Sequence, residues 1–304
     1  MASMDRRILV GTDKGLWELR GDQLESVDQL GARRVTALAR HGEETWAIVD
    51  GQTLWHGAAG RWRERATVDG LPATCLASTP DGLLIGSAQA HLLRFDGDML
   101  APVESFDAVE GRDKWHTPWG DPADVRSIAV ALDGAIYVNV HVGGVARSRD
   151  AGRSWTPTLD IEEDVHQVIA HPTRAAVALV AAYEGFGVSR DGGDTWQFLT
   201  EGMHAHYGRA VAVSGETVLV STSTGPGGRR ATLYRKPLDG ETTFVRCEGL
   251  PWFSDNIDTA CLAADGSLAV FGTDDGRIFR SLDGGAHWGL LTKGLPAITG
   301  VTIG

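Results

Sequence analysis

The stretch Ser148-Arg149-Asp150-Ala151-Gly152-Arg153-Ser154-Trp155 decides the fold, because its pattern S-x-D-x-G-x-x-W returns twice more in the chain. The other copies are Ser189-Arg190-Asp191-Gly192-Gly193-Asp194-Thr195-Trp196 and Ser281-Leu282-Asp283-Gly284-Gly285-Ala286-His287-Trp288. Ser and Asp side chains bond the backbone N–H groups of tight turns, and glycine readily adopts a positive φ. Each copy therefore predicts a hairpin turn over which the Trp ring packs.

Each copy lies inside a longer unit of four short apolar segments, which predicts four strands per repeat. Units with the same order surround all three copies, and three degenerate units begin near residues 35, 73 and 210. A four-stranded repeat of about 40 residues is typical of a propeller blade. The segments of the second unit are Val165–Ala170, Ala176–Ala181, Gly185–Ser189 and Trp196–Leu199.

The two ends of the chain supply the remaining blade. Ile298–Ile303 predicts an innermost strand without partners, whereas Ile8–Thr12, Gly15–Leu19 and Leu24–Asp28 predict outer strands without an innermost one. Pairing them closes the ring and removes its open edges. The sequence thus predicts an all-β, seven-bladed β-propeller of four-stranded antiparallel blades. We expect a single domain over residues 1–304, closed by a blade that the N- and C-termini share.

Composition narrows the partners and the location. The formal net charge is −12, which argues against nucleic acids and anionic membranes, because phosphate binding needs a basic surface. The three cysteines have neither zinc-site spacing nor a disulfide framework, which favours a reducing cytoplasm. Cys75 and Cys261 lie in apolar segments and are predicted to be small core residues. No apolar run at the N-terminus predicts a signal peptide or membrane span, and Met1-Ala2-Ser3 before Met4 is typical of a cloning remnant.

The top face of the ring is the predicted location of a site. We use this name for the face that carries the loops entering each innermost strand and the loops joining second to third strands. The S-x-D-x-G-x-x-W turns lie on the opposite face. Irregular loops on a rigid scaffold often carry binding residues, so we predict a pocket for a small polar ligand at the top of the channel. The irregular top-face segments span residues 107–124, 202–208, 222–230 and 251–256.

The candidate residues share this top-face position. The residues assigned to catalysis are His116, His166, His206, Asp124, Arg126, Tyr207 and Arg209. Those assigned to substrate binding are Trp115, Trp119, Tyr183, Glu184, His204, Trp252, Asn256 and Asp258. Imidazoles on consecutive blades suit acid–base chemistry or a divalent transition metal, which would use His116, His141, His166 and His206. The competing interpretation is a wet channel mouth in which these groups, together with Asp164, form salt bridges between blades.

The three motifs and the blade pattern resemble the BNR/Asp-box, or sialidase-like, propellers, and most of all the stand-alone bacterial members. That superfamily includes sialidases, xyloglucanases, sorting receptors such as sortilin and photosystem II assembly factors, so the resemblance implies a fold and no single reaction. Sialidases use six blades, an arginine triad and an Arg-Ile-Pro motif near the N-terminus. This chain reads Arg6-Arg7-Ile8-Leu9 there, which makes a glycoside hydrolase with paired carboxylates the less favoured alternative.

Two classes of function remain open from the sequence. The first is an enzyme of hydrolase or lyase type that acts on a small polar substrate in the top-face pocket, with or without a divalent transition metal as cofactor. The second is a non-catalytic scaffold that uses the same face to bind a ligand or a protein partner.

Overall fold

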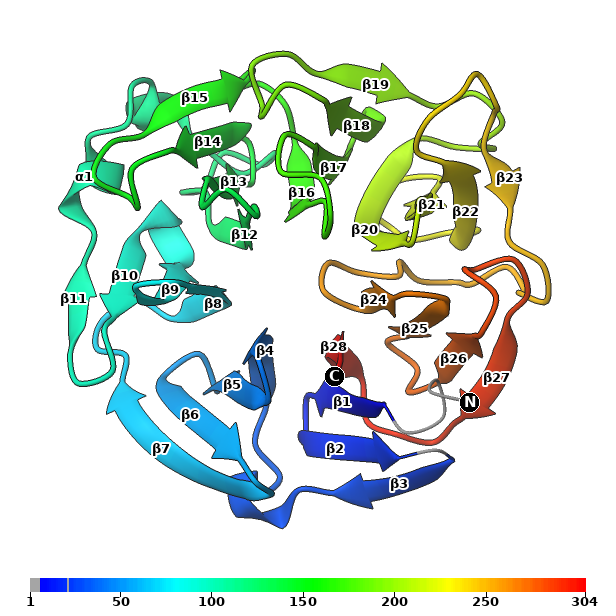
Figure 1. Ribbon diagram of the computed structural model, residues 1–304, viewed down its shortest axis with the longest axis horizontal. Helices are drawn as coiled ribbons and strands as arrows, with labels where there is room; N and C mark the ends of the chain where they lie inside the picture. Colours follow the sequence, from blue (N-terminus) through cyan, green and yellow to red (C-terminus); the bar gives the residue numbers. More distant parts are fainter. Residues whose placement is uncertain (1–5, 21) are drawn as a thin grey trace.

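Seven four-stranded antiparallel sheets surround a central channel, and the protein is a seven-bladed β-propeller (Figure 1). The structure is a computed structural model that describes residues 6–20 and 22–304. The predicted fold is confirmed, including the blade in which the C-terminal strand pairs with the N-terminal three. The predicted cloning remnant Met1-Ala2-Ser3 lies outside the described residues.

Every blade runs from an innermost strand at the channel to an outermost strand at the rim. The first four blades are β28 (Ile298–Ile303), β1 (Arg7–Thr12), β2 (Gly15–Arg20) and β3 (Gln23–Ser26); β4 (Val35–His41), β5 (Glu44–Val49), β6 (Thr53–Ala58) and β7 (Arg61–Thr67); β8 (Ala73–Thr79), β9 (Gly82–Ser87), β10 (Leu92–Phe95) and β11 (Leu100–Pro102); β12 (Val125–Val130), β13 (Ile136–Val140), β14 (Val145–Ser148) and β15 (Thr156–Leu159). The last three are β16 (Val165–Ala170), β17 (Ala178–Ala182), β18 (Gly185–Ser189) and β19 (Gln197–Leu199); β20 (Tyr207–Ser214), β21 (Thr217–Ser223), β22 (Thr232–Pro237) and β23 (Val245–Arg246); β24 (Leu262–Asp265), β25 (Leu268–Gly272), β26 (Ile278–Ser281) and β27 (Gly289–Thr292).

Short helical turns connect some of these strands. The described residues contain no helix that is long and apolar enough to cross a membrane. The helical segments are η1 (Asp28–Leu30), η2 (Ala88–Ala90), α1 (Glu104–Asp107) and η3 (Arg112–Lys114).

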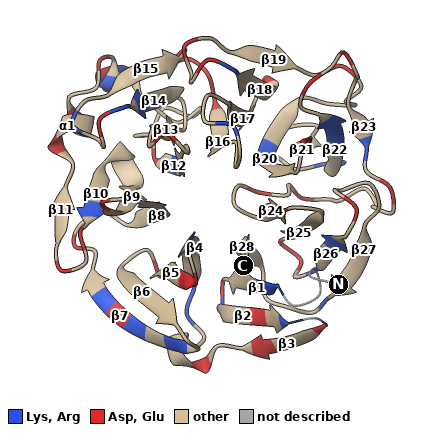
Figure 2. Cartoon of the chain, in the orientation of Figure 1, with Lys and Arg blue, Asp and Glu red and all other residues tan. Residues whose placement is uncertain are grey.

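The hydrophobic core lies between neighbouring blades. The second strands of several blades are buried along their whole length, as in β13, β17 and β25, because both faces of each such strand pack against another sheet. The outermost strands meet solvent on one side and carry charges there, as β7 does (Figure 2). The predicted core positions of Cys75 and Cys261 are confirmed, since both side chains are buried.

The three S-x-D-x-G-x-x-W stretches form the same turn. The Ser Oγ accepts a hydrogen bond from the motif Gly N–H at 2.8, 2.7 and 2.9 Å in the three copies. The Asp Oδ1 accepts from the backbone N–H four residues later at 2.9 Å in each. Side-chain and backbone hydrogen bonds from Ser154 lower the pKa of Asp150 to about 2, and Thr195 does the same for Asp191. These side chains are committed to the turn.

The first copy of this turn contains a strained residue. Ala151 has a φ of 61°, at the position where the other copies have Gly192 and Gly284. A left-handed conformation costs a non-glycine residue about 1–2 kcal/mol, which a glycine would not pay. Glycine in turn loses more conformational entropy on folding, which cancels about 0.5–1 kcal/mol of that gain. We therefore expect Ala151→Gly to raise the free energy of unfolding by roughly 0.5–1 kcal/mol, measured by urea denaturation. The reverse variant Gly192→Ala should lower the free energy of unfolding. A change in the same direction for both variants would contradict the explanation.

One predicted innermost strand begins later than expected. The sequence suggested a strand over 258–263, whereas β24 starts at Leu262. A turn precedes it, in which Cys261 N–H donates to the Asp258 carbonyl at 3.0 Å and Ala260 has a φ of 63°. Asp258 is therefore a loop residue, and its carboxylate is free to reach the neighbouring blade.

Candidate functional site

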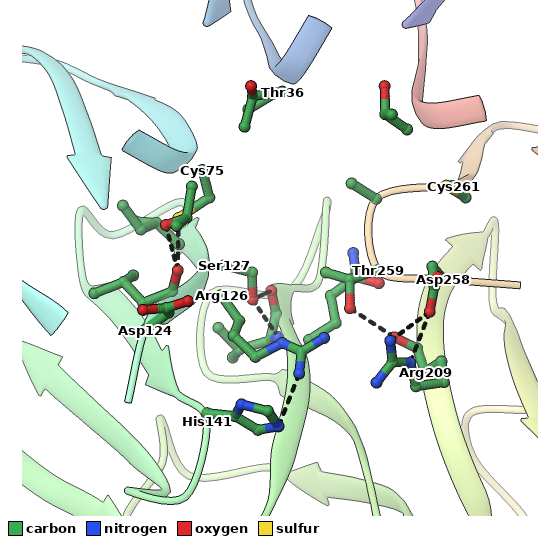
Figure 3. A pocket seen from close by; sticks show the side chains of 18 of the residues that line it. Thr36, Cys75, Asp124, Arg126, Ser127, His141, Arg209, Asp258, Thr259 and Cys261 are labelled. Carbon is green, nitrogen blue, oxygen red and sulfur yellow. Dashed lines mark hydrogen bonds and ion pairs between the residues drawn. The ribbon is translucent and has the colours of Figure 1, made fainter. Parts of the chain in front are cut away.

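The central channel contains a cavity of about 1190 Å³ that touches the innermost strands of all seven blades (Figure 3). Alternation along β12 shows how a strand lines it. Arg126, Ile128 and Val130 are partly exposed toward the channel, while the residues between them are buried. Charged groups therefore occupy the upper part of the cavity, and aliphatic side chains lie deeper.

A β-bulge near the start of the innermost strand recurs in six blades. The register shifts by one residue in each of them. Five of the six residues at the shift line the cavity, whereas His166 lies behind its wall. Three blades carry threonine at this bulge position, whereas three consecutive blades carry charged or ionisable groups. The bulge residues are Thr299, Thr36, Thr74, Arg126, His166 and Arg209.

Two of the threonines bond the neighbouring blade, while Thr36 accepts from the Gly51 N–H of its own blade at 2.9 Å. Thr299 Oγ1 donates to the carbonyl of Val35 in the next blade at 2.6 Å, and Thr74 Oγ1 donates to that of Val125 at 2.5 Å. His166 and Arg209 also bond the next blade, through the Gly208 carbonyl and Asp258, but together with Arg126 they bring groups suited to chemistry or recognition. We call the group of side chains that gathers around them the polar arc. It consists of Asp124, Arg126, His141, Asp164, His166, Tyr207, Arg209 and Asp258.

Arg126 is a cation without a carboxylate partner. Its Nη1 donates to His141 Nε2 at 3.0 Å, and its guanidinium forms no ion pair within the described chain. Burial, followed by the positive charge of Arg209, lowers the pKa of Arg126 to about 10. The negative charges of Asp164 and Asp258 offset this only in part. The guanidinium therefore faces the cavity with its charge incompletely compensated.

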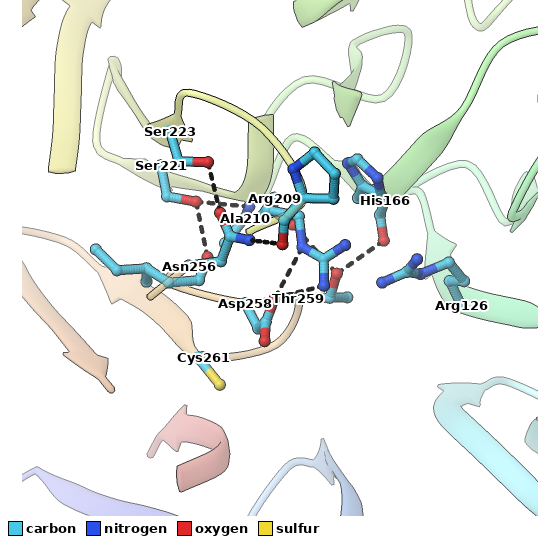
Figure 4. A network of polar contacts seen from close by, with 12 residues as sticks. Arg126, His166, Arg209, Ala210, Ser221, Ser223, Asn256, Asp258, Thr259 and Cys261 are labelled. Carbon is cyan, nitrogen blue, oxygen red and sulfur yellow. Dashed lines mark hydrogen bonds and ion pairs between the residues drawn. The ribbon is translucent and has the colours of Figure 1, made fainter. Parts of the chain in front are cut away.

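Arg209, in contrast, is fully engaged. Its Nη2 and Nε lie 2.6 and 2.7 Å from Asp258 Oδ1, and its Nη1 donates to Tyr207 Oη at 3.4 Å (Figure 4). Burial alone would lower the pKa of Arg209, but Asp258 reverses the shift and raises it. Thr259 Oγ1 also bonds the backbone carbonyls of His166 and Arg209 at 2.9 and 3.2 Å, which ties three blades together.

Two imidazoles flank one carboxylate beside Arg126. Asp164 Oδ1 lies 3.4 Å from His141 Nε2 and 3.3 Å from His166 Nε2. His166 is fully buried, and its ring Nδ1 lies 2.5 Å from the Gly208 carbonyl oxygen. Burial, with Arg126 adding to it, lowers the pKa of His141 to about 4. Burial also lowers the pKa of His166 despite the nearby Asp164. Both rings are thus neutral at physiological pH.

Some predicted site residues meet in this cavity. Trp119 and Tyr183 form an exposed rim, with the Trp119 ring 5.5 Å from that of His141 and the Tyr183 ring 6.0 Å from that of Tyr207. Asp124 lines the wall while its Oδ1 accepts from Gln89 N–H at 3.0 Å. The predicted residues that line the cavity are Trp119, Asp124, Arg126, His141, Tyr183, Tyr207, Arg209 and Asp258, and His166 lies directly behind them.

The remaining predicted site residues lie outside the cavity lining. Five of them have local contacts of their own. Trp115 packs on Phe106, and His116 Nδ1 bonds the Thr117 carbonyl at 2.7 Å. His204 contacts Tyr234 and Trp252, Trp252 stacks with Arg246, and Asn256 bonds Ser223 and Pro226. Glu184 and His206 are exposed. Of the four histidines predicted to bind metal, the structure brings together only His141 and His166, and it adds Asp164 to them.

Sequence reasoning placed Asp164 in the polar cluster but did not assign it to the catalytic, binding or metal-ligating residues, and it gave no role to Arg34, which also lines the cavity. A signal for Asp164 was present. The starts of three consecutive innermost strands read Asp124-Val125-Arg126, Asp164-Val165-His166 and Tyr207-Gly208-Arg209, each with two polar residues around a small or apolar one. In three other blades the second of these polar positions, the bulge position, holds threonine, and that contrast marks the polar arc.

No family model matches the chain, and no curated protein matches it. Solved structures do. The chain is similar to a GH74 xyloglucanase from Xanthomonas campestris, with 17% identity, a TM-score of 0.73, and coverage of 96% of this chain and 53% of that one. It thus spans about half the length of that xyloglucanase.

Two smaller propellers are similar over most of their own length. One is YCF48 bound to D1 peptide, with 14% identity, a TM-score of 0.60 and coverage of 93% of this chain and 88% of that one. The other is the computationally designed Ika8 protein, with 16% identity, a TM-score of 0.63 and coverage of 97% of this chain and 86% of that one. An enzyme, a peptide-bound protein and a design share this architecture, so the likeness establishes the β-propeller fold and no activity.

Proposed function

We propose that the top of the channel binds a small ligand that carries an acidic group, and that Arg126 is the main contact of that group. The supporting observation is the guanidinium that faces the cavity without a carboxylate partner in the described chain, although acids outnumber bases in the sequence by 40 to 28. A guanidinium binds a carboxylate through two parallel hydrogen bonds. An anion placed there would complete the compensation of the Arg126 charge.

The walls indicate what the rest of the ligand resembles. Trp119 and Tyr183 offer ring faces at the rim, and Tyr207 supplies a hydroxyl beside Arg209. Ile128 and Ile169 line the cavity at greater depth. A compact molecule with one acidic end and a planar or apolar body would satisfy both regions.

We extend the proposal to catalysis of hydrolase or lyase type. Asp164 Oδ1 lies 3.4 Å from His141 Nε2, the nitrogen to which Arg126 donates, so a carboxylate base lies close to the cation. A base beside a cation that holds a substrate anion suits proton abstraction or water activation. The non-catalytic alternative uses the same contacts for binding alone.

A panel of small carboxylates tests the binding proposal. We would titrate acetate, succinate, citrate, glucuronate and N-acetylneuraminate against the protein by calorimetry and thermal shift. Replacing Arg126 by Met should weaken binding of the best ligand roughly 10- to 100-fold, because a hydrogen bond to a charged group contributes about 1.5–3 kcal/mol. Arg149→Met, in a motif turn on the opposite face, is the matched control. Unchanged binding in Arg126→Met, or no binding by any carboxylate, would contradict the proposal.

A protein partner is the second candidate function. The observation that favours it is three exposed aromatic side chains on the top face, Trp119, Tyr183 and Trp252, which are 68%, 57% and 43% exposed. Aromatic residues are enriched at protein interfaces, and YCF48 has been solved with a peptide. Trp252→Ala, outside the cavity, should then weaken capture of the partner and leave carboxylate binding intact.

We also propose that the chain belongs to the Asp-box propellers. The support is the hydrogen-bond pattern that the three turns share, in which Ser binds the Gly N–H and Asp binds the residue four positions later. A single domain and a cytoplasmic location remain predictions.

A further inference from the structure

We propose that His141, Asp164 and His166 form a binding site for a divalent transition metal ion in the upper channel. The site shares His141 and Asp164 with the pocket proposed above and adjoins Arg126, but ion binding does not require the acidic ligand. The three donor atoms, two imidazole nitrogens and one carboxylate oxygen, all lie within 4.8 Å of one another. Imidazole and carboxylate ligands suit Zn²⁺ and its first-row neighbours.

The arrangement of protons indicates that a cation belongs between these atoms. The Gly208 carbonyl oxygen can only accept, so the His166 Nδ1 that lies 2.5 Å from it carries a proton, and Nε2 is the ring nitrogen left to bind an ion. His141 Nε2 also presents a lone pair, because it accepts from Arg126. Both nitrogens lie within 3.4 Å of Asp164 Oδ1, itself an acceptor. Three acceptors facing one another repel unless a cation joins them.

The two most buried of these atoms have no other partner. His166 Nε2 and Asp164 Oδ1 are inaccessible to solvent, and neither has a hydrogen-bond partner in the described chain. The His166 side chain is 0% exposed. Leaving such groups unpaired costs about 1–3 kcal/mol each. A metal ion would satisfy both at once.

Two of the three distances between ligand atoms fit a tetrahedral ion, and the third, between the two imidazole nitrogens, is within 4.8 Å. Zn–N bonds of 2.0–2.1 Å and Zn–O bonds of 2.0–2.2 Å place neighbouring ligand atoms about 3.3–3.5 Å apart. The Asp164 oxygen lies 3.3 Å from one imidazole nitrogen and 3.4 Å from the other. Asp164 and His141 line the cavity, so the fourth position of the ion would open toward it. Three protein ligands and one open position are typical of catalytic rather than structural zinc.

The surroundings support His166 as a ligand. Metal-binding histidines commonly donate their second ring nitrogen to a backbone carbonyl, as His166 does to Gly208. A Cβ on residue 208 would lie 3.0 Å from the Gly185 carbonyl oxygen, so glycine is needed to place that carbonyl. Arg126 is the competitor, because its Nη1 occupies the His141 lone pair. We infer that Arg126 turns toward the cavity when the ion binds.

Titration of the full-length, metal-stripped protein with Co²⁺ and Zn²⁺ tests the site. We expect one Co²⁺ per chain with the visible absorption of a four-coordinate ion, displaced by Zn²⁺, and a rise in melting temperature with Zn²⁺. Asp164→Asn keeps the shape of the side chain and should weaken Co²⁺ binding by more than the roughly 10- to 100-fold caused by losing an outer-shell partner. Arg126→Met should tighten it.

His116→Ala and His206→Ala are the matched controls, since each removes a top-face imidazole outside the cluster. Both should bind Co²⁺ as the wild type does. His141→Ala, which leaves the fully buried His166 in place, is a second ligand variant should Asp164→Asn fail to fold. The proposal is overturned if no stoichiometric Co²⁺ binds, if Asp164→Asn binds it unchanged, or if His206→Ala abolishes binding equally.

Discussion

Deleting residues 296–304, which removes β28, is expected to abolish cooperative folding of the propeller. Ile298 and Val301 are buried in this strand, and burying each contributes about 1.5–3 kcal/mol. The deletion also removes the pairing with β1 and the Thr299 bond to the neighbouring blade. The sum is comparable with the 5–15 kcal/mol that typically stabilises a whole protein.

The measurement is urea denaturation followed by tryptophan fluorescence. Because the missing strand is a separate end of the chain, a synthetic peptide of residues 296–304 added in trans should restore a cooperative transition, whereas a scrambled peptide should not. A truncated protein that unfolds with the wild-type midpoint would show that the shared blade does not hold the ring closed.

Replacing Gly86 by Leu is expected to destabilise the protein by about 3 kcal/mol or more, at the upper end of the cost of overpacking. Gly86 lies in β9, where a Cβ would come within 2.4 Å of Val125 Cγ1 and 2.7 Å of Cys75 Sγ. Val125 is fully buried at the start of the next blade. The same close approach recurs between Gly272 and Ile298, so it belongs to the packing of blade against blade.

Gly289→Leu is the matched control, because a Cβ at that position meets nothing within 4 Å. At about 2–4 °C per kcal/mol, Gly86→Leu should lower the melting temperature by roughly 6–12 °C and Gly289→Leu by much less. Similar melting temperatures for the two variants would refute the steric explanation.

The architecture could be predicted because its determinants are local. A turn such as Ser189–Trp196 is specified by side chains that bond their own backbone within four residues, so the pattern is legible in one stretch of sequence. The shared blade followed from counting strands. The late start of β24 was missed, because the left-handed turn at Ala260 depends on a conformation that alanine rarely adopts.

The site was harder to predict because its determinants are not local. The sequence places both His141 and His204 on the top face, yet His141 contacts Arg126 and His204 contacts Tyr234. Which of them reaches the channel depends on blade tilt and loop path. The bulges that place Arg126 at the cavity and His166 behind its wall depend on pairing with a neighbouring strand, and no single stretch of sequence encodes that register.

The polar arc has a genetic consequence. All of its members lie between Asp124 and Asp258, on consecutive blades, so one uninterrupted segment of coding sequence carries the whole set. The threonine bulges that hold the opposite side of the ring are divided between the two ends of the chain. Recombination that exchanges the central segment between two such propellers would transfer one complete set of polar groups to a propeller whose terminal blades come from the other parent. Laboratory chimaeras can be made with the same segment boundaries.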